Sequence, residues 1–321
     1  MIIVGVESTA HTFGVGIVTD KGKILANLKD SYTSKDVGMI PHEIAEHHEK
    51  VAAQLLKKAF RSAKVEWKDI DLLAYSAGPG LDPVLWRGYN IVKGWAGKHN
   101  TKLVGVNHCC AHLSIGKLWN KLKDPVYLYV SGVNTQIIVQ EQKKKGEGKY
   151  HVLGETLDIG LGNMLDKFGR IVGLGFPAGS KIEELGKKGK YIELPYIVKG
   201  MDVSFSGLLT KAQQLVERKQ AVKEDLCFSL QETAFAMCAE VAERALAHSG
   251  KKELLLVGGV GANKRFCEML DLMCKERGAK FYKVPMELAG DQGAMIAWEG
   301  FLRKDSYGDM KVNCQWRADE V

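Results

Sequence analysis

The sequence lacks any long hydrophobic run, although 45% of its 321 residues are hydrophobic. A membrane-spanning helix needs ~20 consecutive apolar residues, and no stretch approaches that length, which excludes an integral membrane protein. The first six residues, MIIVGV, lack the basic segment that begins a secretory signal peptide. We therefore expect a soluble protein of the cell interior, cytoplasmic, or also nuclear if the source is eukaryotic, with no membrane partner.

Paired cysteine motifs are also absent. None of the seven cysteines forms a C-x-x-C pair, which excludes zinc knuckles and favours a reducing compartment. Strong charge of one sign is lacking as well, because the net charge is only +7. Such a balance permits binding to a phosphate-rich partner, but an ordinary soluble basic surface explains it equally well.

The predicted secondary structure follows the same order in the two halves of the sequence. In the first half, strands are predicted at 2–7 and 13–18, and a second hairpin and then alternating helices and strands follow them. In the second half, strands are predicted at 126–130, 136–140 and 150–156, and they too are followed by alternating helices and strands. This order predicts a duplicated α/β fold with two lobes around a central cleft. We place the lobes at 1–124 and 125–321, and a helical insertion in the second lobe at about 162–250.

Glycine-rich turns recur where predicted strands end: Gly78-Pro79-Gly80, Ser131-Gly132, Gly258 to Asn263, and Gly290-Asp291-Gln292-Gly293. Glycine lets backbone amides approach an anion, and a following helix adds its dipole. A single such turn is usually only a turn. Their recurrence in both lobes favours a phosphate-binding cleft.

Two histidines, His108 and His112, follow the apolar run 102–106 one helical turn apart. Side chains four residues apart on a helix point the same way, so the pair suggests a metal site. The alternative is two structural histidines at a strand end, and spacing alone leaves the two interpretations about even. Neighbouring helix positions point ~100° apart, so Cys109 and Cys110 cannot both face a metal and are expected in the core.

Five strings together resemble one family: NHCCAH (107–112), YVSGVNTQ (129–136), GETLD (154–158), KGMDVSFSG (199–207) and GGV (258–260). The family is the universal tRNA threonylcarbamoyl-adenosine transferases, in their archaeal and eukaryotic form, and the resemblance runs from Gly5-Val6-Glu7 to the final RADEV (317–321). It implies an actin-like, sugar-kinase-like fold. It also implies transfer of threonylcarbamoyl from its adenylate to the adenosine beside the tRNA anticodon.

The same resemblance implies partners and ligands. The partners are tRNA and the other subunits of the KEOPS assembly, a small dimerising subunit at the N-terminal lobe and a small kinase or ATPase at the C-terminal lobe. The ligands are one divalent metal, iron or zinc, and ATP or threonylcarbamoyl-adenylate. The implied metal ligands are His108, His112, Tyr129 and Asp291.

The resemblance also implies which residues bind the adenylate: Tyr129, Ser131, Gly132, Val133, Asn134, Asp166, Gly179, Glu183 and Asn263. From sequence alone, a solvated helix face would explain Asp166 and Glu183, and a plain helix cap would explain Asn263. Glu7 and His11 match the family's opening motif, and we assign them to the catalytic centre. A lone turn histidine is otherwise more often polar surface.

The chain departs from the family pattern at several positions. Val133 replaces a glycine in the phosphate loop, where a β-branched residue would resist a positive φ. Asp82, Trp86, Ala178, Ser180 and Gln292 also differ from the usual residues. These changes keep open a second function, a non-catalytic paralogue that acts as a dimerising or tRNA-docking subunit. A zinc peptidase is strongly disfavoured, because Cys109 occupies the position where that chemistry needs a glutamate.

Basic residues offer a route to tRNA. Lys57, Lys58, Arg61 and Lys64 on one predicted helix, with the lysines at 143–145 in a hairpin tip, would grip phosphates in a salt-sensitive manner. The alternative is a solvated lysine face. No series of RNA-stacking aromatic residues is visible, so we assign base recognition to partner subunits.

Overall fold

The computed structural model describes residues 1–33, 40–141, 148–306 and 308–321. The chain divides into two compact units. Unit 1 comprises Met1–Trp119, Glu141–Tyr150 and Gly290–Val321, and unit 2 comprises Asn120–Gln140 and His151–Ala289.

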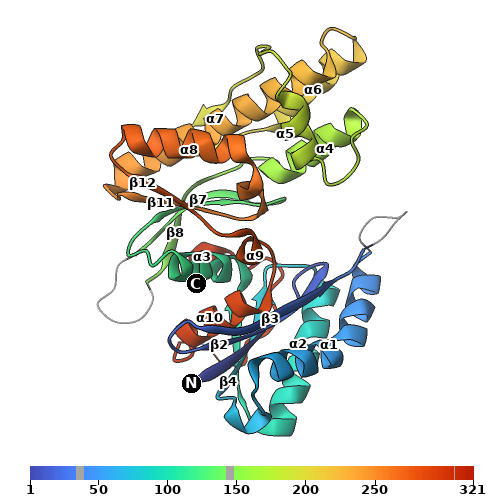
Figure 1. The fold of residues 1–321 in the computed structure, drawn as a ribbon, viewed down its shortest axis with the longest axis vertical. Coiled ribbons are helices and arrows are strands. Elements are labelled where there is room, and N and C mark those ends of the chain that lie inside the picture. Colours follow the sequence, from blue (N-terminus) through green and yellow to red (C-terminus); the bar gives the residue numbers. More distant parts are fainter. Residues whose placement is uncertain (34–39, 142–147, 307) are drawn as a thin grey trace. The chain divides into compact units, whose positions relative to one another are not determined.

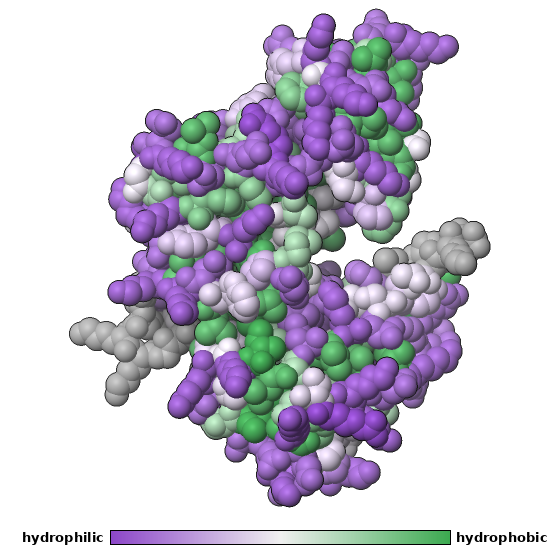
Figure 2. Space-filling model, viewed as in Figure 1, coloured by the Kyte–Doolittle hydropathy of each residue, from purple (hydrophilic) through white to green (hydrophobic). Residues whose placement is uncertain are grey.

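The predicted lysine tip at 143–145 lies outside the described residues. No described helix is both long and apolar enough to span a membrane, and the face drawn in Figure 2 is largely hydrophilic.

Unit 1 is built on a five-stranded sheet of order β3-β2-β1-β4-β5. Its strands are β1 (Ile2–Glu7), β2 (Thr12–Thr19), β3 (Ile24–Ser31), β4 (Leu72–Gly78) and β5 (Lys102–Asn107). Its helices are α1 (Pro41–Ala63), α2 (Asp82–His99), α3 (His108–Trp119) and α10 (Gly293–Arg303), with short 3-10 turns at Trp67–Asp69 and Ala318–Glu320. Helices α1 and α2 lie side by side, and α10 packs against α3 and the sheet (Figure 1).

Unit 2 repeats the topology, because its sheet order β12-β11-β6-β7-β8 mirrors that of unit 1. Its strands are β6 (Val126–Val130), β7 (Thr135–Gln140), β8 (Tyr150–Glu155), β11 (Glu253–Val257) and β12 (Lys280–Lys283), with a small hairpin of β9 (Val198–Lys199) and β10 (Asp202–Val203). Its helices are α4 (Leu161–Ile171), α5 (Gly179–Gly186), α6 (Ser206–Glu217), α7 (Lys223–Ser249), α8 (Lys264–Glu276) and α9 (Met286–Ala289), with a 3-10 turn at Gly259–Ala262.

The shared strand order confirms the predicted duplicated α/β fold. In each unit the first two strands are antiparallel. The central strand then pairs in parallel with one later strand, β4 or β11, which in turn pairs in parallel with the edge strand β5 or β12. Helices α4 to α7 lie between β8 and β11 in the sequence, where the helical insertion was expected. The division of the chain differs from the expected boundary at residue 124, because residues 290–321 return to unit 1.

Glycines explain why residues 290–321 pack with unit 1. A Cβ at Gly16 would lie 2.0 Å from the backbone nitrogen of Ala294, and one at Gly5 would lie 2.1 Å from that of Ala297. Helix α10 therefore rests directly on the backbone of β1 and β2. This contact fixes the segment before α10, which carries Asp291.

We predict that Gly16→Ala destabilises the protein by about 1–3 kcal/mol or more, because the added methyl group cannot fit against α10. Gly94→Ala is the matched control, since no atom lies within 4 Å of its added Cβ and the position is on helix α2. There the substitution should be neutral or stabilising by up to ~1 kcal/mol. Urea unfolding of both variants tests this, and equal midpoints would contradict it.

His48 is a fully buried histidine on the sheet-facing side of α1. Its ring centroid lies 5.2 Å from that of Phe13 on β2. Burial, aided by the charges of His47 and His11, lowers the pKa of His48 to about 4, although the His11 backbone acts in the opposite direction. His48 is therefore neutral in the folded protein at pH 5 and protonated in the unfolded chain, where its pKa is ~6.5.

Acidification from pH 7.5 to 5 should therefore cost stability, because only the unfolded chain takes up this proton. The contribution of His48 to that loss is about 2 kcal/mol, from ~1.4 kcal/mol per pH unit below 6.5. In His48→Gln the loss between the two pH values should be smaller by that amount. Unfolding free energies at both pH values measure it, and identical losses in the two proteins would refute the assignment.

Candidate functional site

The sequence brings three segments together at one edge of the unit 1 sheet. Strands β1 and β5 both pair in parallel with β4, so their carboxyl ends meet at the same edge. Glu7 ends β1, and His108 begins α3 directly after β5. Asp291 reaches the same place because α10 packs on β1 and β2. Residues almost 300 positions apart in the chain thus share one site.

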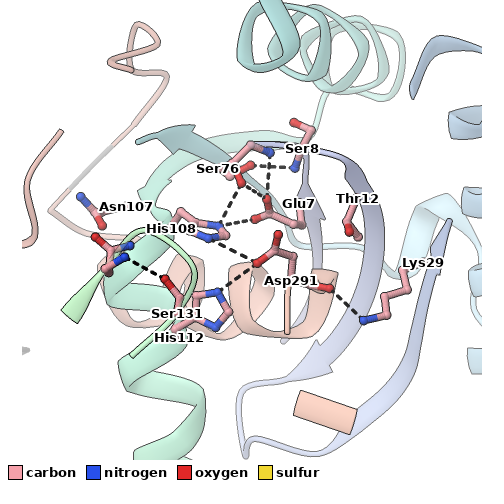
Figure 3. A network of polar contacts seen from close by, with 12 residues as sticks. Glu7, Ser8, Thr12, Lys29, Ser76, Asn107, His108, His112, Ser131 and Asp291 are labelled. Atoms are coloured by element: carbon pink, nitrogen blue, oxygen red, sulfur yellow. Dashed lines mark hydrogen bonds and ion pairs between the residues drawn. The ribbon is translucent and has the colours of Figure 1, made fainter. Parts of the chain in front are cut away.

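The predicted ligands His108, His112 and Asp291 converge within unit 1 (Figure 3). Asp291 Oδ1 lies 3.3 Å from Nε2 of His112 and 3.6 Å from Nε2 of His108. Donors bound at ~2.0–2.1 Å in a tetrahedral zinc site lie roughly 3.3 Å apart. These two spacings are close to that value, so the three side chains could hold one divalent ion.

Glu7 stands behind His108 and fixes its orientation. Its carboxylate is fully buried, and Oε2 lies 2.8 Å from Nδ1 of His108. The other oxygen, Oε1, accepts hydrogen bonds from the backbone nitrogen and the hydroxyl of Thr9, at 2.8 and 2.5 Å. With Nδ1–H directed at Glu7, His108 presents Nε2 to the metal position. Such a carboxylate partner is usual for metal-binding histidines.

Burial and neighbouring charges shift the pKa values of His108, His112 and Asp291. Burial alone would lower the pKa of His108, but the charge and hydrogen bond of Glu7, with the charge of Asp291, raise it to about 9. Burial lowers the pKa of His112. Burial would raise the pKa of Asp291, but the His112 hydrogen bond and the two imidazoles hold it well below its usual range. Asp291 is thus a carboxylate, as a hard metal ligand must be.

Two further residues assigned to this centre are placed less directly. Tyr129 lies near the end of β6 in unit 2, and its role as the fourth ligand stays a prediction. His11 lies in the turn between β1 and β2, and its charge helps to lower the pKa of Asp291. Thr9 was missed by sequence reasoning, because a threonine in a turn carries no signal of its own.

Unit 2 contains a cavity of about 400 Å³ at the start of its helices. Five of the residues predicted to bind the adenylate line it: Gly132, Asp166, Gly179, Glu183 and Asn263. The predicted residues Ser131, Val133 and Asn134 belong to the β6–β7 turn, next to the lining residue Gly132. The structure therefore gathers residues separated by up to 131 positions around one hollow.

Several of these side chains also hold the cavity wall together. One oxygen of Asp166 accepts from the backbone nitrogen of Ala178 at 2.8 Å, and one of Glu183 accepts from that of Lys264 at 2.8 Å. Asn263 caps α8 by accepting from Phe266 at 2.9 Å. The predicted cap is thus present. Each carboxylate retains a second oxygen that can accept from a ribose hydroxyl.

The expectation of backbone strain at Val133 is wrong. Among the described residues, the non-glycine positions with positive φ are Lys64, Asn100, Lys121 and Lys219. The Val133 side chain is 70% exposed, so it does not press into the loop. The turn is held by other contacts, including a 3.0 Å hydrogen bond from the Asn134 nitrogen to the Ser131 hydroxyl. The turn therefore accommodates Val133 without a left-handed backbone.

Gln292 is a second departure that the structure accommodates. Its side-chain oxygen accepts from the backbone nitrogen of Met295 at 3.1 Å and caps α10. Helix α10 therefore begins at Gly293. Asp291 is left outside the helix, where its carboxylate faces the two histidines.

Comparisons with known proteins find sequences and folds similar to this chain. A family described as TsaD, tRNA N6-adenosine threonylcarbamoyltransferase, matches residues 23–298. A tRNA N6-adenosine threonylcarbamoyltransferase of Thermococcus kodakarensis is 51% identical over 100% of this chain and 98% of its own length. The homologue of Methanopyrus kandleri is 51% identical over 94% of this chain and 87% of its own.

Other matches add a longer relative and the fold. A probable bifunctional tRNA threonylcarbamoyladenosine biosynthesis protein of Methanosarcina mazei is 49% identical over 99% of this chain but only 58% of its own length. The crystal structure of T. kodakarensis HypF superposes with a TM-score of 0.66 at 16% identity, covering 95% of this chain and 48% of that one. At this identity the superposition supports the fold alone.

We predict that Glu7→Gln weakens binding of Zn²⁺ or Fe²⁺ by about 10- to 100-fold, because His108 loses the carboxylate that fixes its tautomer. Ser76→Ala is the control: Ser76 lies in the same network but accepts from the Ser8 nitrogen, at 2.9 Å, and donates to the Val6 carbonyl, at 3.5 Å. Its metal affinity should stay within about twofold of the unaltered chain. Calorimetric titration measures both, and unchanged affinity in Glu7→Gln would rule out the orienting role.

Proposed function

Because the chain belongs to the tRNA N6-adenosine threonylcarbamoyltransferase family, we propose that it transfers threonylcarbamoyl from threonylcarbamoyl-adenylate to the adenosine beside the tRNA anticodon. The exocyclic amine forms a bond to the carbamoyl carbon, the bond from that carbon to the phosphate oxygen breaks, and AMP leaves with the amine proton lost. The observation that carries the proposal is the His108–His112–Asp291 cluster with Glu7 behind it, on a chain that matches transferases along its full length.

In this proposal His108, His112 and Asp291 hold one iron or zinc ion, and Tyr129 is the fourth ligand. The bound ion would supply Lewis-acid polarisation of a carbamoyl or phosphate oxygen. The chain's own contribution is to position the ligands: Glu7 orients His108, and both imidazoles are buried. His11, in the adjacent turn, is our candidate for accepting the amine proton.

The adenylate is assigned to the 400 Å³ cavity of unit 2. Asp166 and Glu183 suit ribose hydroxyls, which donate hydrogen bonds, and the glycines at 132 and 179 leave room for the ligand. Lys57, Lys58, Arg61 and Lys64 lie on the exposed side of α1, or directly after it, and are assigned to tRNA phosphates. We assign the remaining KEOPS subunits as partners, the dimerising subunit to unit 1 and the kinase to unit 2.

The test of this function is a transfer assay with synthetic threonylcarbamoyl-adenylate and an unmodified tRNA transcript, with and without the KEOPS partners. Mass spectrometry of the digested tRNA should detect N6-threonylcarbamoyladenosine. The His112→Ala variant should give none, because it lacks a predicted metal ligand. No product from the unaltered chain, even with its partners, would contradict the proposal.

The substitution at residue 133 yields a separate prediction. Because Val133 is exposed and unstrained, we expect Val133→Gly to bind ATP within about threefold of the unaltered chain, a difference below 1 kcal/mol. Calorimetric titration of ATP into both proteins measures this. Binding by the glycine variant alone would instead favour the second function, a paralogue that keeps the fold but has lost nucleotide binding.

A further inference from the structure

The segment that follows α10 forms an irregular strap along unit 1, which we call the C-terminal strap and define as residues 308–321. It contains little regular structure, yet Trp316, Ala318 and Val321 are only 3–6% exposed. Burial of this kind in an irregular segment requires specific backbone partners. The residues that bind the backbone of the C-terminal strap indicate its role.

One partner is the glycine turn after β4. The Asn313 nitrogen donates to the Ala77 carbonyl at 2.8 Å, and the Gly80 nitrogen donates to the Cys314 carbonyl at 3.2 Å. A Cβ at Gly78, whose φ is +152°, would lie 1.8 Å from the Asn313 oxygen. Close approach of the strap therefore explains why glycine occupies position 78.

The second partner is Asn107, the last residue of β5 and only 1% exposed. Its Oδ1 accepts from the Cys110 nitrogen at 3.1 Å, and thereby caps the first turn of α3. Its Nδ2 donates to the carbonyls of Trp316 and Arg317, at 3.0 and 3.3 Å. One amide thus joins the strap to the helix that carries both histidine ligands. Figure 3 shows Asn107 beside His108 at the start of that helix.

We propose that Asn107 is a positioning residue through which the C-terminal strap fixes His108 for metal binding. The inference rests on the metal site of the proposed function. His108 is the first residue of α3, in the turn that frays most readily when its backbone donors lack partners. His112 lies one turn further along α3, where the backbone donors have partners within the helix. Loss of the strap contact therefore displaces His108 first.

The experiment compares Asn107→Ser, removal of residues 316–321, and the two changes together. Serine can still cap α3 but cannot donate to both strap carbonyls. Each change should weaken Zn²⁺ binding by about tenfold, and the combination should weaken it no further, because both break the same contact. Ser114→Ala is the control, since Ser114 is buried on the same helix and donates to the nearby Ala111 carbonyl at 3.2 Å. It should stay within about twofold of the unaltered chain.

A second measurement needs no metal. Hydrogen exchange of the first-turn amides of α3 should accelerate in Asn107→Ser and in the shortened chain, while exchange in α1 stays unchanged. Normal metal affinity with normal exchange in both would overturn the inference and leave the proposed function intact. The inference would also be overturned if the loss of Zn²⁺ affinity in the combined variant equalled the product of the two separate losses. Failure of the unaltered chain to bind metal would overturn both proposals.

Discussion

The packing of α10 directly on the backbone of β1 and β2 is the constraint on which the rest of unit 1 depends. It is achieved by glycines on both sides of the contact, at positions 5, 14, 16 and 293, where any Cβ would overlap the opposing backbone. The contact carries residues 290–321 back to the first half of the chain. Without it, Asp291 could not face His108 and His112, and the strap could not reach α3.

The resulting site brings two carboxylates and two imidazoles together in a largely buried position. Glu7 is fully buried and Asp291 is partly so, and the two carboxylates oppose two imidazoles. Burial of unpaired carboxylates is costly, so each is held by a hydrogen bond to a histidine. This arrangement orients donors before any ligand arrives. A divalent ion could fit it, because Asp291 Oδ1 lies 3.3 and 3.6 Å from the two Nε2 atoms, close to the donor spacing of tetrahedral coordination.

Much of this could be predicted from the sequence. Apolar runs located β1 and β6 with the same bounds as the structure, and the four-residue spacing of His108 and His112 predicted their common direction. Strand β12 was missed because it has four residues and two of them are lysines, a pattern typical of surface loops. The β9–β10 hairpin was missed because each of its strands has two residues.

Contacts between distant residues were beyond sequence reasoning. Glu7 and His108 are 101 residues apart, and Asn107 and Trp316 are 209 apart. Neither pairing follows from local pattern, and both depend on which strand ends meet at one edge of the sheet. The error at Val133 has the same origin. A glycine in a family motif was taken to require positive φ, whereas the local hydrogen bonds of the turn hold an ordinary backbone there.

The central claim is that this chain itself holds a metal ion between α3 and the segment before α10. Elemental analysis by mass spectrometry, after purification without added metal, tests it most directly when the unaltered chain is compared with the His108→Ala, His112→Ala double variant. We predict about one iron or zinc per chain in the unaltered protein, as a single site requires, and nearly none in the variant. Equal metal content in the two proteins would contradict the account.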